Sequence, residues 1–194
     1  MLRWRIAILV SAAIAISYLD RQTLPVAIKA IQRDIPISNE VKAFLDSAFL
    51  FAYGCMYLGG GWLMDRLGTR RGFAITMAFW SLACMSHGIA TGVAMLATSR
   101  LLLGIGEGGG IPAATRAVVE WFPVRERSTA MGIINAGTAV GAVVAPPLIA
   151  VVLSKIGWLN LAHWRWVFFI TGAFGFAWII WWVDRSAGRP YIRL

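Results

Sequence analysis

Four ionisable residues interrupt stretches of sequence that are otherwise apolar: Asp20, Arg21, Arg100 and Glu107. A charged side chain at the centre of a membrane helix costs roughly 2.5–3.5 kcal/mol on insertion scales. Each of these residues therefore needs a partner, a water-filled cavity or a function. A structural ion pair that locks two helices together is the plainer alternative.

Arginine and carboxylate side chains in such a setting suit the recognition of an anion. A guanidinium group matches a carboxylate in two hydrogen bonds and keeps its charge when water is removed. Two arginines and two carboxylates balance, so protonation of one carboxylate leaves a net positive charge that can hold an anion. Glu107 lies among glycines and apolar residues, where burial disfavours the charged form. The residue types indicate coupling of an anion to H⁺, with Na⁺ left open.

Helix geometry predicts where these residues lie. Counting 1.5 Å per residue from the expected helix ends places Asp20, Arg21 and Arg100 at one depth, with Glu107 and Tyr53 deeper. Arg100 and Glu107 are seven residues apart, so they share a helix face but lie ~10.5 Å apart along the axis, and a direct bond would be strained. We expect the first and fourth helices to present one polar cluster.

Two further features of this region are less specific. Asp20 and Arg21 are adjacent, so their side chains point about 100° apart and only one can aim squarely at the fourth helix. Tyr18 and Tyr53 either offer hydroxyl groups to a polyol or simply pack against neighbours. The sequence leaves both interpretations of the tyrosines open.

Six long apolar segments carry these residues. They cover residues 4–28, 44–64, 72–91, 94–118, 130–153 and 165–183. Each holds about 20 residues or slightly more, enough to cross a ~30 Å hydrocarbon layer as a helix. The chain is 59% hydrophobic and only 14% charged, whereas soluble domains are about a quarter charged. We predict an all-α membrane protein with six transmembrane helices.

The basic residues of the loops predict the orientation. One set of loops holds Arg3, Arg5, Arg66, Arg70, Arg71, Arg125, Arg127, Arg185, Arg189 and Arg193, and the other holds Lys29, Arg33, Lys42, Lys155 and Arg165. The positive-inside rule then places both termini in the cytoplasm. The net charge of +9 comes from these loops and not from a basic stripe, so no nucleic-acid partner is expected. Tryptophans near the predicted helix ends fit interfacial anchoring: Trp4, Trp62, Trp121, Trp164 and Trp182.

The cysteines and histidines give little indication of a chemical function. Cys55 and Cys84 both fall in apolar runs and are interpreted as small buried hydrophobes, not as a disulfide or metal pair. His87 and His163 are isolated, and His87 is expected to cap a helix. We therefore expect no metal, no cofactor and no enzyme. Glycines should let the fourth and fifth helices approach their neighbours closely: Gly104, Gly106, Gly108, Gly109, Gly110, Gly132, Gly137 and Gly141.

The loop after the second apolar segment carries a recognisable motif. It reads G-x-x-x-D-R-x-G-x-R-R, with its defined positions at Gly61, Asp65, Arg66, Gly68, Arg70 and Arg71. This pattern resembles the loop signature of the major facilitator superfamily. Gly68 permits a tight turn, and the charged residues can change partners when two halves of a transporter rock. We predict a gating loop; the plainer interpretation is that the arginines only enforce topology.

Further stretches resemble the anion:cation symporter branch of that superfamily. They are Tyr18-Leu-Asp20-Arg21, Arg100 to Glu107, Glu120 to Ser128, Ala145-Pro146-Pro147 and Trp164-Arg165. The branch includes bacterial hexuronate and aldonate transporters, and the stretch from residue 120 to 147 is similar to these sugar-acid carriers. The resemblance implies a bacterial inner-membrane symporter in which Arg21 and Arg100 contact the substrate carboxylate. It also implies that Asp20 and Glu107 carry protons.

The resemblance covers nearly the whole chain but implies a larger assembly. Such transporters have about twelve helices in two halves, with the site between them. We expect this sequence to be the N-terminal half and a C-terminal six-helix half to complete the site, from the same protein or as a separate chain. A carrier of phosphate, an aromatic acid or an amino-acid anion remains an alternative, as does a remnant that does not transport.

Overall fold

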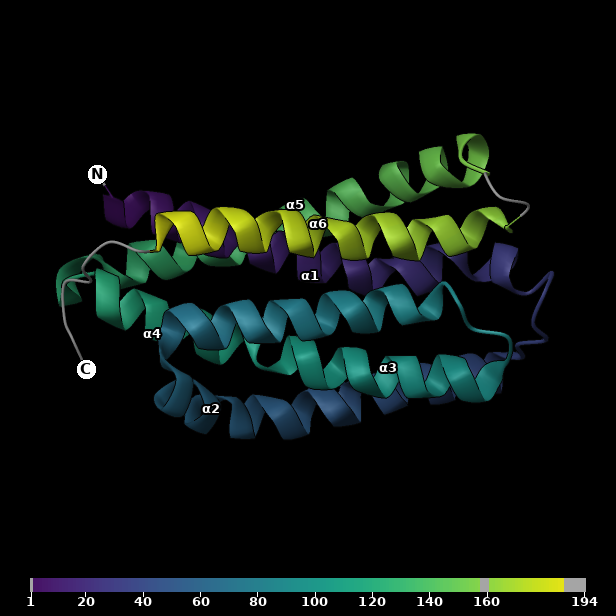
Figure 1. Cartoon of the computed structure of the whole chain (residues 1–194), viewed down its shortest axis with the longest axis horizontal. Helices are drawn as coiled ribbons and strands as arrows, with labels where there is room; N and C mark the ends of the chain where they lie inside the picture. Colours follow the sequence, from purple (N-terminus) through teal and green to yellow (C-terminus); the bar gives the residue numbers. More distant parts are fainter. Residues whose placement is uncertain (1, 158–160, 187–194) are drawn as a thin grey trace.

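The helices lie side by side along one direction, as Figure 1 shows. The structure is a computed structural model that describes residues 2–157 and 161–186. In chain order its elements are α1 (Leu2–Ile31), α2 (Asn39–His87), α3 (Val93–Gly108), α4 (Gly110–Trp121), the 3₁₀ helix η1 (Val124–Glu126), α5 (Arg127–Lys155) and α6 (His163–Arg185). Every element in the described ranges is helical, which confirms the all-α prediction. Arg189 and Arg193 lie outside these ranges.

Helix α2 consists of two antiparallel arms. Gly68 has φ 73° and ψ 156°, which is not helical and reverses the chain. Glycine adopts a positive φ without the steric penalty of a Cβ atom. The first arm (residues 39–67) contains the predicted segment 44–64, and the second arm (residues 69–87) runs back beside it (Figure 1). The predicted segment 72–91 extends past the end of this arm at His87.

The predicted helix 94–118 is not continuous. It is divided at Gly109 into α3 and α4. Pro112 has no N–H to donate to the carbonyl of Gly108, and its ring crowds that turn. Three consecutive glycines (residues 108–110) also disfavour a regular helix there. The interruption is a single residue, since Gly109 keeps helical dihedral angles (φ −76°, ψ −13°). The predicted span 94–118 is thus two helices, α3 and α4, that follow each other directly.

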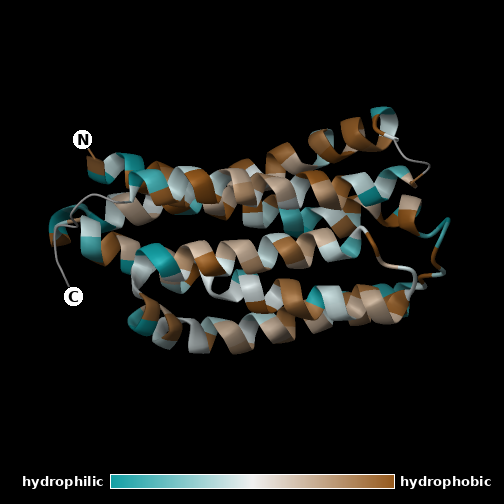
Figure 2. Ribbon diagram, viewed as in Figure 1, coloured by the Kyte–Doolittle hydropathy of each residue, from teal (hydrophilic) through white to brown (hydrophobic). Residues whose placement is uncertain are grey.

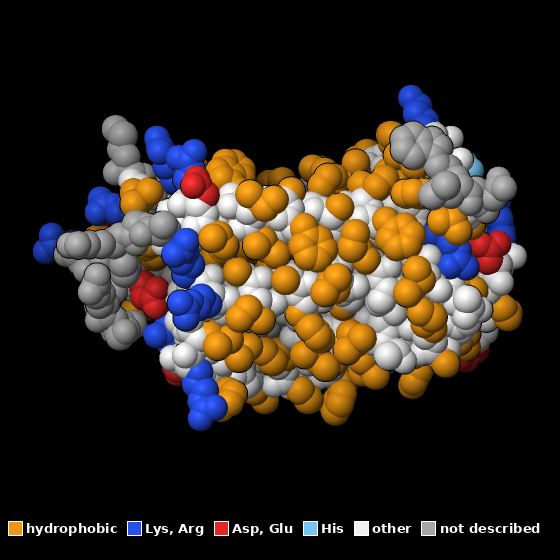
Figure 3. Space-filling view, viewed as in Figure 1, with side chains coloured by type: hydrophobic (Ala, Val, Ile, Leu, Met, Phe, Trp, Pro, Cys, Tyr) orange, Lys and Arg blue, Asp and Glu red, His pale blue; other side chains and the backbone are white. Residues whose placement is uncertain are grey.

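Four helical stretches are long and apolar enough to cross a membrane. They are α1, α2, residues 124–155 and α6. With 49 residues and the reversal at Gly68, α2 is long enough for two crossings. Hydrophilic residues gather toward the two ends of the bundle and apolar ones between them (Figure 2), and Lys and Arg lie toward both ends of the face in Figure 3. The number of six crossings stays a prediction.

Glycines allow two close helix contacts. A methyl group on Gly104 would lie 2.5 Å from the Phe49 carbonyl oxygen, and one on Gly108 would lie 2.6 Å from that of Tyr53. These contacts join α3 to the first arm of α2. Gly137 and Gly141 bring α5 equally close to backbone oxygens of α1. The predicted close approach is thus found at these four glycines. Gly132 differs, because a methyl group there would meet open space.

Three of the five tryptophans predicted to anchor the protein at the interface are buried inside it: Trp121, Trp164 and Trp182. Trp164 and Trp182 are fully buried. The Trp164 indole donates to Asp34 at 2.7 Å, and that of Trp182 donates to the Arg70 carbonyl at 3.0 Å. Each ring is held in the protein because its N–H ties α6 to another segment, the loop after α1 for Trp164 and the second arm of α2 for Trp182. Trp62, by contrast, is 60% exposed.

We expect Gly104→Ala to lower the melting temperature of the purified chain in detergent by several degrees. Forcing a methyl group into a tight contact costs about 1–3 kcal/mol. Gly132→Ala is the matched control and should melt within about 2 °C of the parent chain. Equal melting temperatures for the two variants would contradict the close packing of α3 on α2.

Candidate functional site

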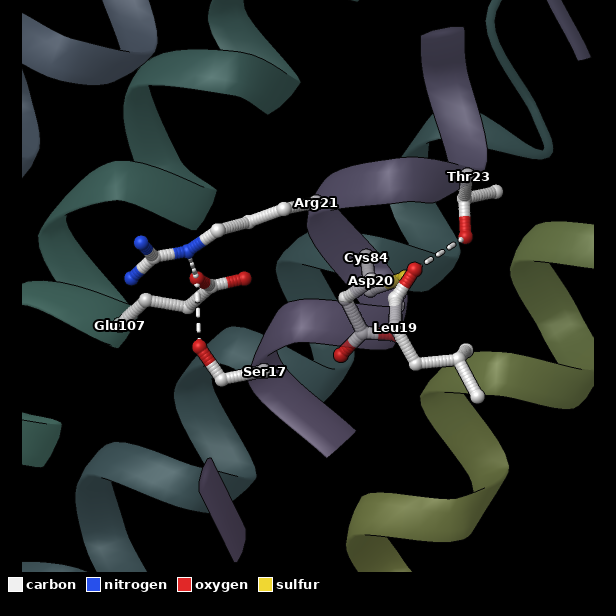
Figure 4. Close-up of polar contacts among 7 residues, drawn as sticks. All are labelled: Ser17, Leu19, Asp20, Arg21, Thr23, Cys84 and Glu107. Atoms are coloured by element: carbon white, nitrogen blue, oxygen red, sulfur yellow. Dashed lines mark hydrogen bonds and ion pairs between the residues drawn. The ribbon is translucent and has the colours of Figure 1, made fainter. Parts of the chain in front are cut away.

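A buried ion pair joins α1 to α3. The Arg21 Nε donates to Glu107 Oε2 at 2.6 Å, and the Ser17 hydroxyl donates to the same oxygen at 2.7 Å (Figure 4). Ser17 and Arg21 are four residues apart and so share one face of α1. The Glu107 side chain is fully buried, whereas that of Arg21 keeps 23% of its surface exposed. The long arginine side chain bridges the depth difference that helix counting assigned to the two residues.

Aromatic rings surround the Arg21 guanidinium. Its central carbon lies 4.8 Å from the ring centre of Tyr18, 4.4 Å from that of Tyr53 and 5.4 Å from that of Phe49. A cation over an aromatic face is attracted by the ring quadrupole. The tyrosines therefore hold the arginine with their faces, a role that the sequence interpretation did not consider. Phe49 was not predicted at all.

Asp20 lies on a different side of α1 from Arg21, as Figure 4 shows. Its Oδ1 accepts a hydrogen bond from the Cys84 thiol at 3.4 Å, and the Cys84 sulfur is 3.3 Å from the Thr171 hydroxyl. The other oxygen, Oδ2, is buried without a hydrogen-bond partner among the described residues. Arg21 and Glu107 therefore form the polar contact expected between the first and fourth predicted helices, but Asp20 lies outside it, because adjacent residues on a helix diverge by about 100°. Thr171 was also not predicted.

The cysteines correct a second prediction. Cys84 is buried as predicted, but it is a hydrogen-bond donor to a carboxylate and not merely a small apolar filler. Cys55 is exposed on the surface of the helix bundle. An apolar residue on a membrane helix can face lipid as readily as the interior, so an apolar run does not by itself predict burial.

Arg100 is more deeply buried than Arg21. It is 2% exposed, and its Nε and Nη2 atoms have no hydrogen-bond partner among the described residues. Its guanidinium lies 5.7 Å from the Phe49 ring centre, the same ring that Arg21 approaches. It makes no bond to Glu107, in line with their separation along the helix. Phe49 thus brings the two arginines to one region, although Asp20 is elsewhere.

The loop motif connects three helices. Arg116 on α4 donates hydrogen bonds to Asp65 and, at 2.9 Å, to Glu120. Arg70 donates to the Val183 carbonyl at 2.6 Å, which ties the Gly68 reversal to the end of α6. Asp65 therefore links α2 to α4, and Arg70 links α2 to α6. Arg116 was not among the predicted site residues.

The other motif residues play smaller parts. The Arg66 guanidinium lies 4.5 Å from the ring centre of Trp62, and Arg71 is exposed. Gly61 lines a groove beside Asp65. No group of three or more His, Cys, Asp or Glu side chains within residues 2–157 and 161–186 is placed to hold a metal ion. His87 Nδ1 lies 2.9 Å from the Ala83 carbonyl near the end of α2.

Long apolar helices that enclose a few buried charged residues are typical of a multi-pass membrane protein. The chain belongs to the Major Facilitator Superfamily, which it matches over residues 10–192. This is a superfamily of transporters and not of enzymes. The chain is 34% identical over 183 residues to a galacturonate transporter of Dickeya chrysanthemi, covering 94% of this chain and 51% of that protein. It is 33% identical over 181 residues to a D-galactonate transporter of Escherichia coli O6:H1, covering 93% of this chain and 40% of that protein.

The chain therefore spans about half the length of the curated relatives that it matches. A solved structure gives the same picture of the fold. A bacterial homolog of the human lysosomal transporter Spinster, in an inward-facing and unoccupied conformation, superposes with a TM-score of 0.87 at 21% identity. The match covers 99% of this chain and 44% of that chain.

We expect Glu107→Ala to destabilise the chain by about 3–5 kcal/mol, because Ser17 and Arg21 lose their shared acceptor. Glu107→Gln keeps an acceptor oxygen at that position and should be less destabilising. Thermal unfolding in detergent measures both variants. If Glu107→Ala melts at the temperature of the parent chain, the ion pair does not stabilise the bundle.

Proposed function

We propose that this chain takes part in secondary active transport of a small organic anion coupled to protons. The anion is a sugar acid, a hexuronate or an aldonate. The observation that carries the proposal is the ion pair between Arg21 and Glu107. Glu107 there pairs with a guanidinium group that is suited to binding the carboxylate of a substrate. The sugar-acid carriers among the relatives support the choice of substrate class.

The proposed coupling is a competition for Arg21. When Glu107 is ionised, it neutralises the arginine and the site has little attraction for an anion. When Glu107 takes up a proton, its hold on the guanidinium weakens, and a substrate carboxylate can replace it in a bidentate contact. Because the Nε donor alone makes the present ion pair, the two Nη groups take no part in it. Proton and anion thus bind together.

Arg100 and Asp20 extend this mechanism. Arg100 has two buried nitrogens without hydrogen-bond partners among the described residues, so an anion near Phe49 gives it the charged partner that it lacks. Asp20, which accepts a hydrogen bond from the Cys84 thiol, is a second carboxylate that can carry a proton. Tyr18 and Tyr53 pack their rings against Arg21, and in this proposal their hydroxyl groups contact the substrate.

We further propose that the chain is the N-terminal, six-helix half of a twelve-helix transporter. The length covered in the relatives supports this. A C-terminal half would complete the cavity, and the Asp65–Arg116 contact would change as the halves rock. The arginine-rich end of the bundle, where α1 begins and α6 ends, would face the cytoplasm of a bacterial inner membrane. H⁺ is the proposed coupling ion, and replacement of Na⁺ in the assay buffer tests the alternative.

Uptake of labelled galacturonate, glucuronate and galactonate into cells tests the function. The chain is expressed alone and fused to the part of the galacturonate transporter beyond its matched region. We expect uptake only by the fused protein, rising several-fold as external pH falls from about 8 to about 5.5. Arg21→Ala and Arg100→Ala should abolish it, while the exposed Arg125→Gln should not. A fused protein that is inserted in the membrane but takes up no sugar acid would refute the assignment.

Glu107→Gln separates binding from coupling. The amide mimics a protonated carboxyl group, so substrate exchange across the membrane should persist in the fused protein. Accumulation driven by a pH gradient should be lost, because the residue cannot release a proton. Counterflow and gradient-driven uptake are measured in the same vesicles. Retention of gradient-driven accumulation by this variant would exclude Glu107 as the coupling residue.

A further inference from the structure

A surface groove runs between α1 and α6 on the outside of the bundle, away from the Arg21–Glu107 ion pair. Six residues line it: Arg5, Ile8, Leu9, Ala12, Trp181 and Arg185. The mechanism proposed above uses none of them. Four are apolar, and the only charged residues in the lining are arginines.

The charged residues of the lining lie at one end of the groove, and the apolar residues extend away from them along the helix axes. Positions 5, 8, 9 and 12 follow the spacing of one helix face, with Arg5 nearest the helix start. On α6, which runs antiparallel to α1 (Figure 1), Trp181 and Arg185 are four residues apart, with Arg185 nearest the helix end. Both arginines therefore lie at the same end of the groove. The apolar part extends ~10 Å from Arg5 toward the middle of the bundle, as far as Ala12.

Arg5 differs from its neighbour Arg3 in its contacts. No described residue makes an ion pair with it. Among the described residues, the ion pair of Arg185 is with its neighbour Asp184, at 3.2 Å, and both of these side chains are exposed. Arg5, Arg185 and Asp184 together give this end of the groove a net charge of +1. Arg3 differs, because it is paired with Glu126 at 2.9 Å.

The floor of the groove is fixed. The Trp178 indole donates a hydrogen bond to the Leu9 carbonyl at 2.8 Å, which joins α6 to α1 below the lining residues. Above this floor, Ile8 is 60% exposed and Trp181 is 56% exposed. The groove therefore combines an elongated, exposed apolar surface with two arginines, Arg5 and Arg185, at one end. Figure 3 shows Lys and Arg gathered at this end beside apolar surface.

We propose that this groove binds one anionic phospholipid. Its phosphate would contact Arg5 and Arg185, and an acyl chain would lie along Ile8, Ala12 and Trp181. Arginine recognises phosphate through charge-assisted hydrogen bonds, and a membrane supplies the ligand at high local concentration. A soluble phosphate would satisfy the arginines but leave the apolar walls uncovered. The inference needs only a membrane location and is independent of what the chain transports.

Native mass spectrometry of the purified chain in detergent tests the site. Phosphatidylglycerol and phosphatidylcholine with identical acyl chains are titrated separately. We expect one phosphatidylglycerol to be retained per chain at concentrations where phosphatidylcholine is not. Arg5→Gln and Arg185→Gln should each weaken it about fivefold, the loss expected for one basic residue near an anionic lipid. Arg125→Gln, at the same end of the bundle but outside the groove, is the matched control and should not weaken it.

A second variant tests the apolar part. Ala12→Phe fills the groove without changing charge, and it should also reduce retention of phosphatidylglycerol. Circular dichroism and the melting temperature without lipid confirm that each variant is folded. Equal retention of the two lipids, an equal loss in Arg125→Gln, or full displacement by inorganic phosphate would overturn the proposal. Loss of lipid in the fused protein described above would also overturn it, since the added half would then cover the groove.

Discussion

The ion pair between Arg21 and Glu107 is the constraint on which the interior of this protein depends. A charge buried in a membrane helix needs a partner, and each of these residues finds one only on another helix. The pair thereby fixes α1 against α3. Ser17 adds a third group to the same oxygen. The shared oxygen thus ties two residues of α1 to one residue of α3.

Glycine packing fixes the helix that carries Glu107. Gly104 and Gly108 remove the side chains that would keep α3 away from the first arm of α2. On that arm, Phe49 lies beside both Arg21 and Arg100. In lipid no hydrophobic force drives helices together, so close backbone approach must supply the association. Small residues and buried charges are therefore two parts of one arrangement.

The arginines at one end of the bundle, which the sequence analysis counted for membrane topology, make different contacts in the structure. A count of basic loops treats them as equivalent, yet each has its own contacts. Arg70 binds a backbone carbonyl of α6, and Arg3 pairs with Glu126. Arg5 makes no ion pair with any described residue and faces a groove. Arginines that a topology count treats alike can thus differ in whether they join helices.

The sequence by itself determined the helical class, the apolar segments and the residue types of the site. Those features follow from local hydrophobicity and from the cost of charge in lipid. It also predicted that Asp20 and Arg21 would diverge, because the helical period fixes that angle. Only the tertiary structure decided the partners. Asp20 meets Cys84, and Arg21 reaches Glu107, because partner choice depends on which helix lies opposite. Helix order in the bundle arises from packing between distant segments, which no local pattern records.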